Sequence, residues 1–327
     1  MPVESVLSMW SPPLSNVMTQ TVGRDRCRMR VNNPFWGQNR PPARRSLPQF
    51  EVWGRLRHHR KTILFCAIPW GTWHNRPMTR VIAVANQKGG VAKTTTVHAL
   101  GAALTERSRR VLMVDLDPQA SLSFATGIED EPEPSMHDVM MGRAVIADIL
   151  YESNGIDVAP SSIDLAGAEV HLLTRTGREY VLQRALRPLL DGYDFVLIDC
   201  PPSLGILTIN GLTAASEVLI PLQAELLTRR GLGQLLDTVT DVRSFTNPDL
   251  SVLGAVITMH DSRTRLGRDV LEEIRRTHQV SILEPYIPKS VKVAEAPGRG
   301  MSVLGHARTS PAAEAYRRIA ATVDGGT

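Results

Sequence analysis

The sequence predicts an α/β fold in which a mostly parallel, twisted sheet is flanked by helices. Short apolar runs recur from residue 80 onward, helical patterns separate them, and the runs lack the alternation of strands with one face in water. Strands that are apolar on both faces are typical of parallel sheets covered by helices on each side.

The expected elements follow in order along the chain. Continuous apolar runs predict strands at residues 80–86, 110–115, 157–159, 194–200, 217–221, 252–258 and 280–285. Helices are expected at residues 93–107, 163–174, 178–190, 229–245, 265–278 and 311–323, with further helices in the remaining gaps.

Residues 1–77 differ from the body, residues 78–327. The N-terminal extension contains all five tryptophans, and its proline pairs and arginine clusters interrupt every candidate helix. It has no sustained helical or strand period and no signal-peptide pattern, so we expect it to be disordered. Two alternatives are that translation begins at Met78, or that the extension is a basic arm that binds DNA or a partner.

The charge of the chain is unevenly distributed. Of its 37 basic and 33 acidic residues, twelve basic and three acidic lie in residues 1–77, which leaves 25 basic and 30 acidic in the body. A nucleic-acid surface on the body must therefore be a local patch.

Membrane and disulfide classes find no support in the sequence. No apolar run approaches the roughly 18 residues of a spanning helix. Cys27, Cys66 and Cys200 show no paired spacing, which favours a reducing cytoplasm without a disulfide frame or cysteine-based zinc site.

A glycine-rich loop at residues 86–96, NQKGGVAKTTT, joins the first strand of the body to a helix. Gly89 and Gly90 let the backbone turn and point N–H groups at phosphate oxygens. Lys93 supplies a cation to the β- and γ-phosphates, Thr94 a hydroxyl to Mg²⁺, and Thr95 a donor to the α-phosphate. The start of the helix adds its positive end.

The loop departs from the common GxxxxGK[ST] pattern. Gln87 replaces the first glycine and Ala92 precedes the lysine, while a second lysine, Lys88, opens the loop. The methyl group of Ala92 predicts a negative φ at that position.

Two acidic motifs end later strands. In VDLDPQAS, Asp115 and Asp117 share one face if the strand stays regular to its end. We expect Asp117 to position the attacking water and Asp115 to contact Mg²⁺ indirectly, or a lysine. In FVLIDCPPSLG, Asp199 is expected to hold Mg²⁺ through water, and Cys200 to be a packed core thiol.

The motifs KGGxxKT and DxDPQ resemble those of the ParA/MinD/Soj family of deviant Walker P-loop ATPases. The resemblance implies that Lys88 reaches across a homodimer to the nucleotide of the partner, as an arginine finger does. It implies an ATP and Mg²⁺ site formed by Lys88, Gly89, Gly90, Val91, Ala92, Lys93, Thr94 and Thr95. No strong general base stands out, so hydrolysis is expected to be slow, as in a switch.

Three later segments resemble the ParA/Soj branch: PLQAE at 221–225, ITMHDSRT at 257–264 and IPKSVKVAEA at 287–296. By this resemblance, Met259 and Pro288 are candidate adenine contacts. The branch implies a cytoplasmic, nucleoid-associated ATPase of chromosome or plasmid partitioning that binds DNA without sequence preference and is stimulated by a ParB-like protein.

Four arginines are the chosen DNA contacts: Arg230, Arg263, Arg268 and Arg276. They come from a larger basic set that also includes Arg229, Arg265, Arg275, Lys289 and Lys292.

Other classes fit less well. A MinD-like positioning ATPase would need a basic amphipathic helix near the end of the chain, where AAEAYRRIAATVDGGT has few large apolar residues. A nitrogenase-iron-protein-like reductase would need two cluster cysteines in the body, and a tyrosine-kinase relative a tyrosine cluster. A nucleotide-binding adaptor for another protein cargo remains an alternative.

Overall fold

The computed structural model describes residues 53–58, 61–66, 78–128, 132–225, 228–261, 272, 274, 276–278 and 280–325. The chain divides into two units, Met1–Gly71 and Thr72–Thr327. In the first unit, β1 (Trp53–His58) and β2 (Lys61–Cys66) form an antiparallel pair that the sequence did not predict. Disorder in the rest of the extension stays a prediction, because those residues lie outside the described part.

The second unit is built on an eight-stranded sheet with the order β10-β9-β8-β3-β7-β4-β6-β5. All neighbouring strands are parallel except β5 and β6, so the predicted fold class is confirmed. The strands are β3 (Arg80–Val84), β4 (Val111–Asp115), β5 (Tyr151–Ser153), β6 (Ile156–Ala159), β7 (Phe195–Asp199), β8 (Glu217–Gln223), β9 (Ser251–Thr258) and β10 (Ile282–Leu283).

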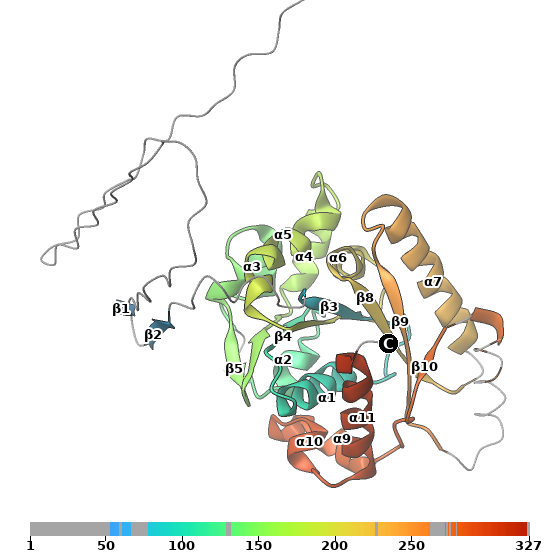
Figure 1. The fold of residues 1–327 in the computed structure, drawn as a ribbon. Coiled ribbons are helices and arrows are strands. Elements are labelled where there is room, and N and C mark those ends of the chain that lie inside the picture. The colour runs from blue at the N-terminus through green and yellow to red at the C-terminus, as the bar shows by residue number, and fades with distance from the viewer. Residues whose placement is uncertain are drawn as a thin grey trace, which may run out of the picture. The chain divides into compact units, whose positions relative to one another are not determined.

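Helices cover both faces of this sheet (Figure 1). The α-helices are α1 (Lys93–Glu106), α2 (Ser121–Ala125), α3 (Met136–Met141), α4 (Leu165–Leu172), α5 (Val181–Leu186), α6 (Ile206–Ala214), α7 (Thr228–Phe245), α9 (Val291–Glu295), α10 (Val303–His306) and α11 (Pro311–Gly325). Short 3₁₀ turns are η2 (Ile146–Asp148), η3 (Arg178–Tyr180), η4 (Arg187–Gly192) and η5 (Pro297–Arg299).

The apolar strands serve two cores, one on each face of the sheet. Val81 and Ala83 of β3 join the core beneath α3 to α7, whereas Ile82 and Val84 join the core beneath α1, α10 and α11. Successive side chains of a strand point to opposite faces, so a strand covered on both sides must be apolar throughout.

Some element boundaries differ from the sequence-based expectation. The expected helix 178–190 is broken into η3, α5 and η4, and Pro188 lies in the first turn of η4, where a proline is tolerated. The last expected strand contracts to Ile282–Leu283, and most of the expected helix 265–278 lies outside the described residues. The edge strand β5 was not predicted.

Parallel pairing brings the ends of three strands to one edge of the sheet. Asp199 pairs in register with Val84 of β3 on one side and with Asp115 of β4 on the other. The Asp199 segment after β7 therefore lies between the glycine-rich loop after β3 and the Asp117 segment after β4. All three lie at the edge where open α/β sheets bind ligands.

Candidate functional site

The glycine-rich loop is fastened to the neighbouring strand β8 at its start. The Asn86 Nδ2 group donates a hydrogen bond to the Pro221 carbonyl (2.7 Å), and the Lys88 N–H donates to Asn86 Oδ1 (3.0 Å). Asn86 is 4% exposed, so both bonds are shielded from water. Sequence reasoning gave this asparagine no role.

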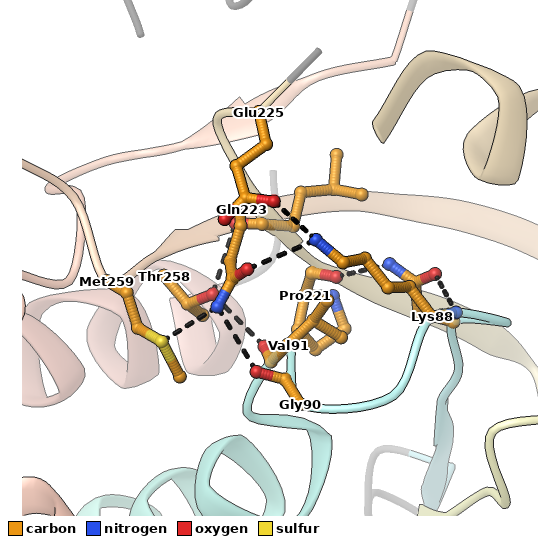
Figure 2. Close-up of polar contacts among 10 residues, drawn as sticks. Lys88, Gly90, Val91, Pro221, Gln223, Glu225, Thr258 and Met259 are labelled. Atoms are coloured by element: carbon orange, nitrogen blue, oxygen red, sulfur yellow. Dashed lines mark hydrogen bonds and ion pairs between the residues drawn. The ribbon is translucent and has the colours of Figure 1, made fainter. Parts of the chain in front are cut away.

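The middle of the loop is held by the ends of β8 and β9 (Figure 2). Gln223 Nε2 donates to the Gly90 carbonyl (3.2 Å) and lies 2.8 Å from the sulfur of Met259. The Thr258 hydroxyl donates to the Val91 carbonyl (3.1 Å). These bonds turn loop carbonyls toward the sheet, which leaves loop N–H groups available to an anion.

The expectation of a negative φ at Ala92 is wrong. Ala92 has a φ of 65°, in the left-handed region, as does Gly90 with a φ of 73°. Ala92 is the residue before α1, and its carbonyl accepts the Thr96 N–H at 2.9 Å. The need to enter the helix from the tight loop outweighs the roughly 1–2 kcal/mol that a left-handed non-glycine residue costs.

Lys93 begins α1 and is only 7% exposed. Its Nζ lies 3.4 Å from the Lys88 carbonyl. Burial lowers the pKa of Lys93, and the nearby Asp199 carboxylate opposes that shift. A buried ammonium in a loop of this shape would gain from the negative charge of a phosphate.

Asp199 is the most unusual polar group of the site. Both of its carboxylate oxygens are buried and have no hydrogen-bond partner among the described residues. Burial raises its pKa well above the ordinary value, Asp115 raises it further, and the Thr94 hydroxyl and Lys93 lower it. Because buried polar groups are rarely left without partners, a cation or a cation-bound water fits beside this carboxylate.

A magnesium ion suits these donors only in company with phosphate. The described residues contain no group of three His, Cys, Asp or Glu side chains that could hold a metal by themselves. Mg²⁺ at nucleotide sites is bound by few protein groups together with phosphate oxygens and waters. The Thr94 hydroxyl and the Asp199 carboxylate match that pattern.

Asp115 is bound by the segment that follows its strand, and its expected indirect contact with Mg²⁺ stays a prediction. Strand β4 ends at Asp115, and the carboxylate accepts the N–H (2.8 Å) and hydroxyl (2.8 Å) of Ser123 and the N–H of Asp117 (3.2 Å). The side chain is fully buried, and burial raises its pKa to about 6. Asp115 therefore anchors the segment that leads to α2, a role that the spacing of the motif did not reveal.

Asp117 lies beyond the end of β4 and lines the cavity described below. It is 8% exposed, and its Oδ1 accepts the Gln119 N–H at 2.9 Å. The second carboxylate oxygen is thus left for a ligand or a water. Asp117 thus lines the same cavity as the glycine-rich loop, and its expected action on the attacking water stays a prediction.

Lys88 is engaged within its own subunit (Figure 2). Its Nζ lies 2.6 Å from Glu225 Oε2 and 3.4 Å from Gln223 Oε1. The side chains of Lys88 and Glu225 are 36% and 57% exposed. Lys88 is absent from the described residues that line the cavity, whereas Lys93 is present there.

A cavity of about 760 Å³ extends from the glycine-rich loop to the segments after β9 and β10. The loop contributes Gly89, Gly90, Ala92, Lys93, Thr94 and Thr95. Met259 and Pro288, the candidate adenine contacts, also line it. His98, Phe124, Met301 and Tyr316 form part of the lining too, and sequence reasoning did not select them.

The candidate DNA contacts are only partly described. Arg276 is exposed in a helical segment. Arg230 belongs to α7 but its side chain is outside the described part, as are Arg263 and Arg268 entirely. Of the larger basic set, Lys292 pairs with Glu295 at 3.0 Å and Lys289 lines the cavity.

The parallel sheet, the glycine-rich loop before α1 and the strand-end carboxylates define a P-loop nucleotide-binding protein. Comparison with known proteins narrows this class. Residues 79–252 match a family model described as an AAA domain.

Two curated relatives carry partitioning or sporulation names. The chain is 43% identical over 249 residues to the sporulation initiation inhibitor protein Soj of Bacillus subtilis, and the match covers 75% of this chain and 98% of Soj. It is 41% identical over 240 residues to the chromosome partitioning protein ParA of Myxococcus xanthus, which covers 72% of this chain and 85% of that protein.

Among solved structures, a cobyrinic acid a,c-diamide synthase from Mycobacterium smegmatis, with bound ATP analog and magnesium, is 50% identical with a TM-score of 0.67. The match covers 75% of this chain and 94% of that one. The chain belongs to the ParA/Soj family of ATPases.

Proposed function

We propose that this chain is an ATP-dependent, dimerising switch ATPase of chromosome or plasmid partitioning. The observation that carries the proposal is the different placement of two lysines on one loop. Lys93 is buried in the cavity beside Asp199, whereas Lys88, five residues earlier, extends along the surface to Glu225. A cation that stays outside its own cavity is suited to reach the nucleotide of a second subunit.

ATP is the proposed ligand of the cavity, with its phosphates at the loop. Lys93 would bind the β- and γ-phosphates, Thr95 the α-phosphate, and Thr94 and Asp199 would hold Mg²⁺. Mg²⁺, when bound, neutralises charge on the transferring phosphoryl group. Asp117 would orient the attacking water through its unused carboxylate oxygen.

The Lys88–Glu225 ion pair gives the switch a resting position. Lys88 must leave Glu225 before it can contact the nucleotide of a partner subunit. Because both side chains are partly exposed, the pair is worth at most about 1 kcal/mol. The restraint is therefore weak enough for ATP and a second subunit to overcome.

DNA binding and stimulation by a ParB-like protein complete the proposal. They are supported by the sequence segments that resemble the ParA/Soj branch, and the partitioning role is supported by the name of the M. xanthus relative. Because the body has more acidic than basic residues, binding would use a local arginine patch and fall steeply with salt. The proposed location is the cytoplasm, on the nucleoid.

A MinD-like membrane switch is less well supported. Tyr316 and Ile319 of α11 are buried in the core against α1, so this face of the helix is not available to a bilayer. No helix in the described part of the chain is long and apolar enough to span a membrane.

The molecular mass of the full chain should be measured with ADP, with ATP, and with ATP plus duplex DNA. We expect a monomer, a dimer and a DNA-bound dimer, and a monomer in every condition for Lys88→Ala. A chain that binds ATP but stays monomeric would refute the switch. A dimer that does not bind DNA at low salt would favour the adaptor alternative or an amide-forming activity such as that named for the M. smegmatis protein.

A further inference from the structure

One buried imidazole faces the nucleotide cavity from the side of α1. His98 comes three residues after Thr95 and four after Thr94, so it lies on the same face of the helix, one turn further from the loop. All three residues line the cavity. His98 is 5% exposed, and it therefore belongs to the wall of the cavity rather than to the outer surface.

The ring of His98 has no hydrogen-bond partner within the described part of the chain, and burial alone lowers its pKa to about 4. The imidazole is therefore neutral near pH 7, with one nitrogen as donor and the other as acceptor. Neither ring nitrogen is among the fully buried, unpaired side-chain atoms of the described residues, so both nitrogens are open to the cavity and can pair with a ligand there.

The lining around His98 differs in character from the loop. Phe124 is 55% exposed and Met301 is 42% exposed, although both line the cavity, and Val293 and Tyr316 are further members of this wall. Such a surface suits a flat, mostly apolar group with polar atoms at its edge.

We propose that His98 donates or accepts a hydrogen bond at the edge of the nucleobase and is a specificity-determining residue for the bound nucleotide. The assignment rests on the proposed binding of ATP, and adds Phe124 and Met301 to Met259 and Pro288 as the apolar surroundings of the base. The phosphates stay with Lys93 and the loop. His98 thus reads the end of the nucleotide that the P-loop motif does not.

The proposal is tested by the affinities of the full chain for ATP, GTP and inorganic tripolyphosphate. His98→Val removes the ring and its hydrogen bond, so we expect ATP affinity to fall about tenfold, the usual range for one such bond plus packing. The ratio of the affinity for ATP to the affinity for GTP should fall, and the affinity for tripolyphosphate should not change. His98→Gln, which keeps a donor and an acceptor, should stay within about threefold of wild type.

The outcomes separate this proposal from the proposed function. Wild-type chain that fails to bind ATP would overturn both. If the wild-type chain binds ATP and His98→Val binds it with the same affinity, only the role of His98 is overturned. The same holds if His98→Val loses affinity for tripolyphosphate as strongly as for ATP. Imidazole ¹⁵N signals of the unaltered chain give a second measurement, independent of variant folding: ATP should shift the His98 signal, and an equal shift with tripolyphosphate would contradict base contact.

Discussion

The Nζ atom of Lys88 lies 2.6 Å from Oε2 of Glu225, a residue 137 positions further along the chain. The pair joins the opening of the nucleotide loop to the end of β8, where Gln223 also contacts the loop. The same lysine is proposed to act on the nucleotide of a second subunit. Its bond within the subunit and its action between subunits therefore compete.

The first prediction concerns this competition. Glu225→Gln removes the charge that holds Lys88, so we expect the ATP-dependent dimer to form at lower protein concentration, by up to about fivefold. Analytical ultracentrifugation with ATP at low salt gives the measurement. Glu106→Gln is the matched control, because the Arg317–Glu106 pair has the same 2.6 Å separation and also lies at the surface. Equal dimerisation of the Glu225 variant and wild type would contradict the competition.

The second prediction separates the two lysines. Lys93→Ala should reduce ATP affinity at least about a hundredfold, since it removes a buried cation from the phosphates. Lys88→Ala should leave the ATP affinity of the monomer within about threefold of wild type. It should abolish the ATP hydrolysis that a ParB-like protein stimulates. Fluorescent-nucleotide binding and phosphate release measure the two effects. Full hydrolysis by Lys93→Ala would refute the site.

The third prediction concerns Asp117. Asp117→Asn retains the bond to the Gln119 N–H but loses the negative charge near the attacking water. We expect hydrolysis to fall about a hundredfold or more while ATP binding persists, which is the range for loss of a group that acts on proton transfer. The ATP dimer should accumulate. If the variant loses ATP binding instead, Asp117 contributes to binding the nucleotide and not to its hydrolysis.

The fourth prediction tests Asp115 as an anchor. Ser123→Ala removes the hydroxyl that donates to Asp115 at 2.8 Å and accepts the Ser161 N–H at 2.9 Å. Because it leaves buried polar groups without partners, we expect a loss of about 1–3 kcal/mol in the free energy of unfolding. Urea denaturation provides the value. Ser244→Ala, which loses an exposed bond to the Thr240 carbonyl, serves as control and should change stability little.

The fifth prediction follows from the lowered pKa of His98. Its folded-state pKa is about 4 and its ordinary value 6.5, so the unfolded chain binds the proton more tightly between these limits. Stability from this residue is present above pH 6.5 and is lost as the pH falls toward 4. We expect a loss of roughly 2 kcal/mol between about pH 7 and pH 5.

Denaturation of wild type and His98→Val at several pH values isolates this contribution from those of the carboxylates. The unfolding free energy of wild type minus that of His98→Val should fall by that amount toward low pH. A difference that stays constant with pH would show that His98 titrates normally.

The sequence by itself determined the α/β class, the nucleotide loop and the strand-end position of Asp199, because each depends on residues close together in the chain. The residues of the glycine-rich loop that are expected to bind phosphate and Mg²⁺ all lie within eleven consecutive positions, 86–96. The buried, continuous apolar runs likewise required a sheet covered on both faces.

Only the tertiary structure decided the partners of these groups. Pairing of β3 with β8 brings Glu225 to Lys88, and the chain path after β4 turns Ser123 onto Asp115. The cavity wall around His98 also depends on segments distant in sequence, which contribute Phe124, Met301 and Tyr316. The spacing of side chains predicts which residues lie on the same face of a strand or helix. The order of the strands and the path of the loops determine which residues that face contacts.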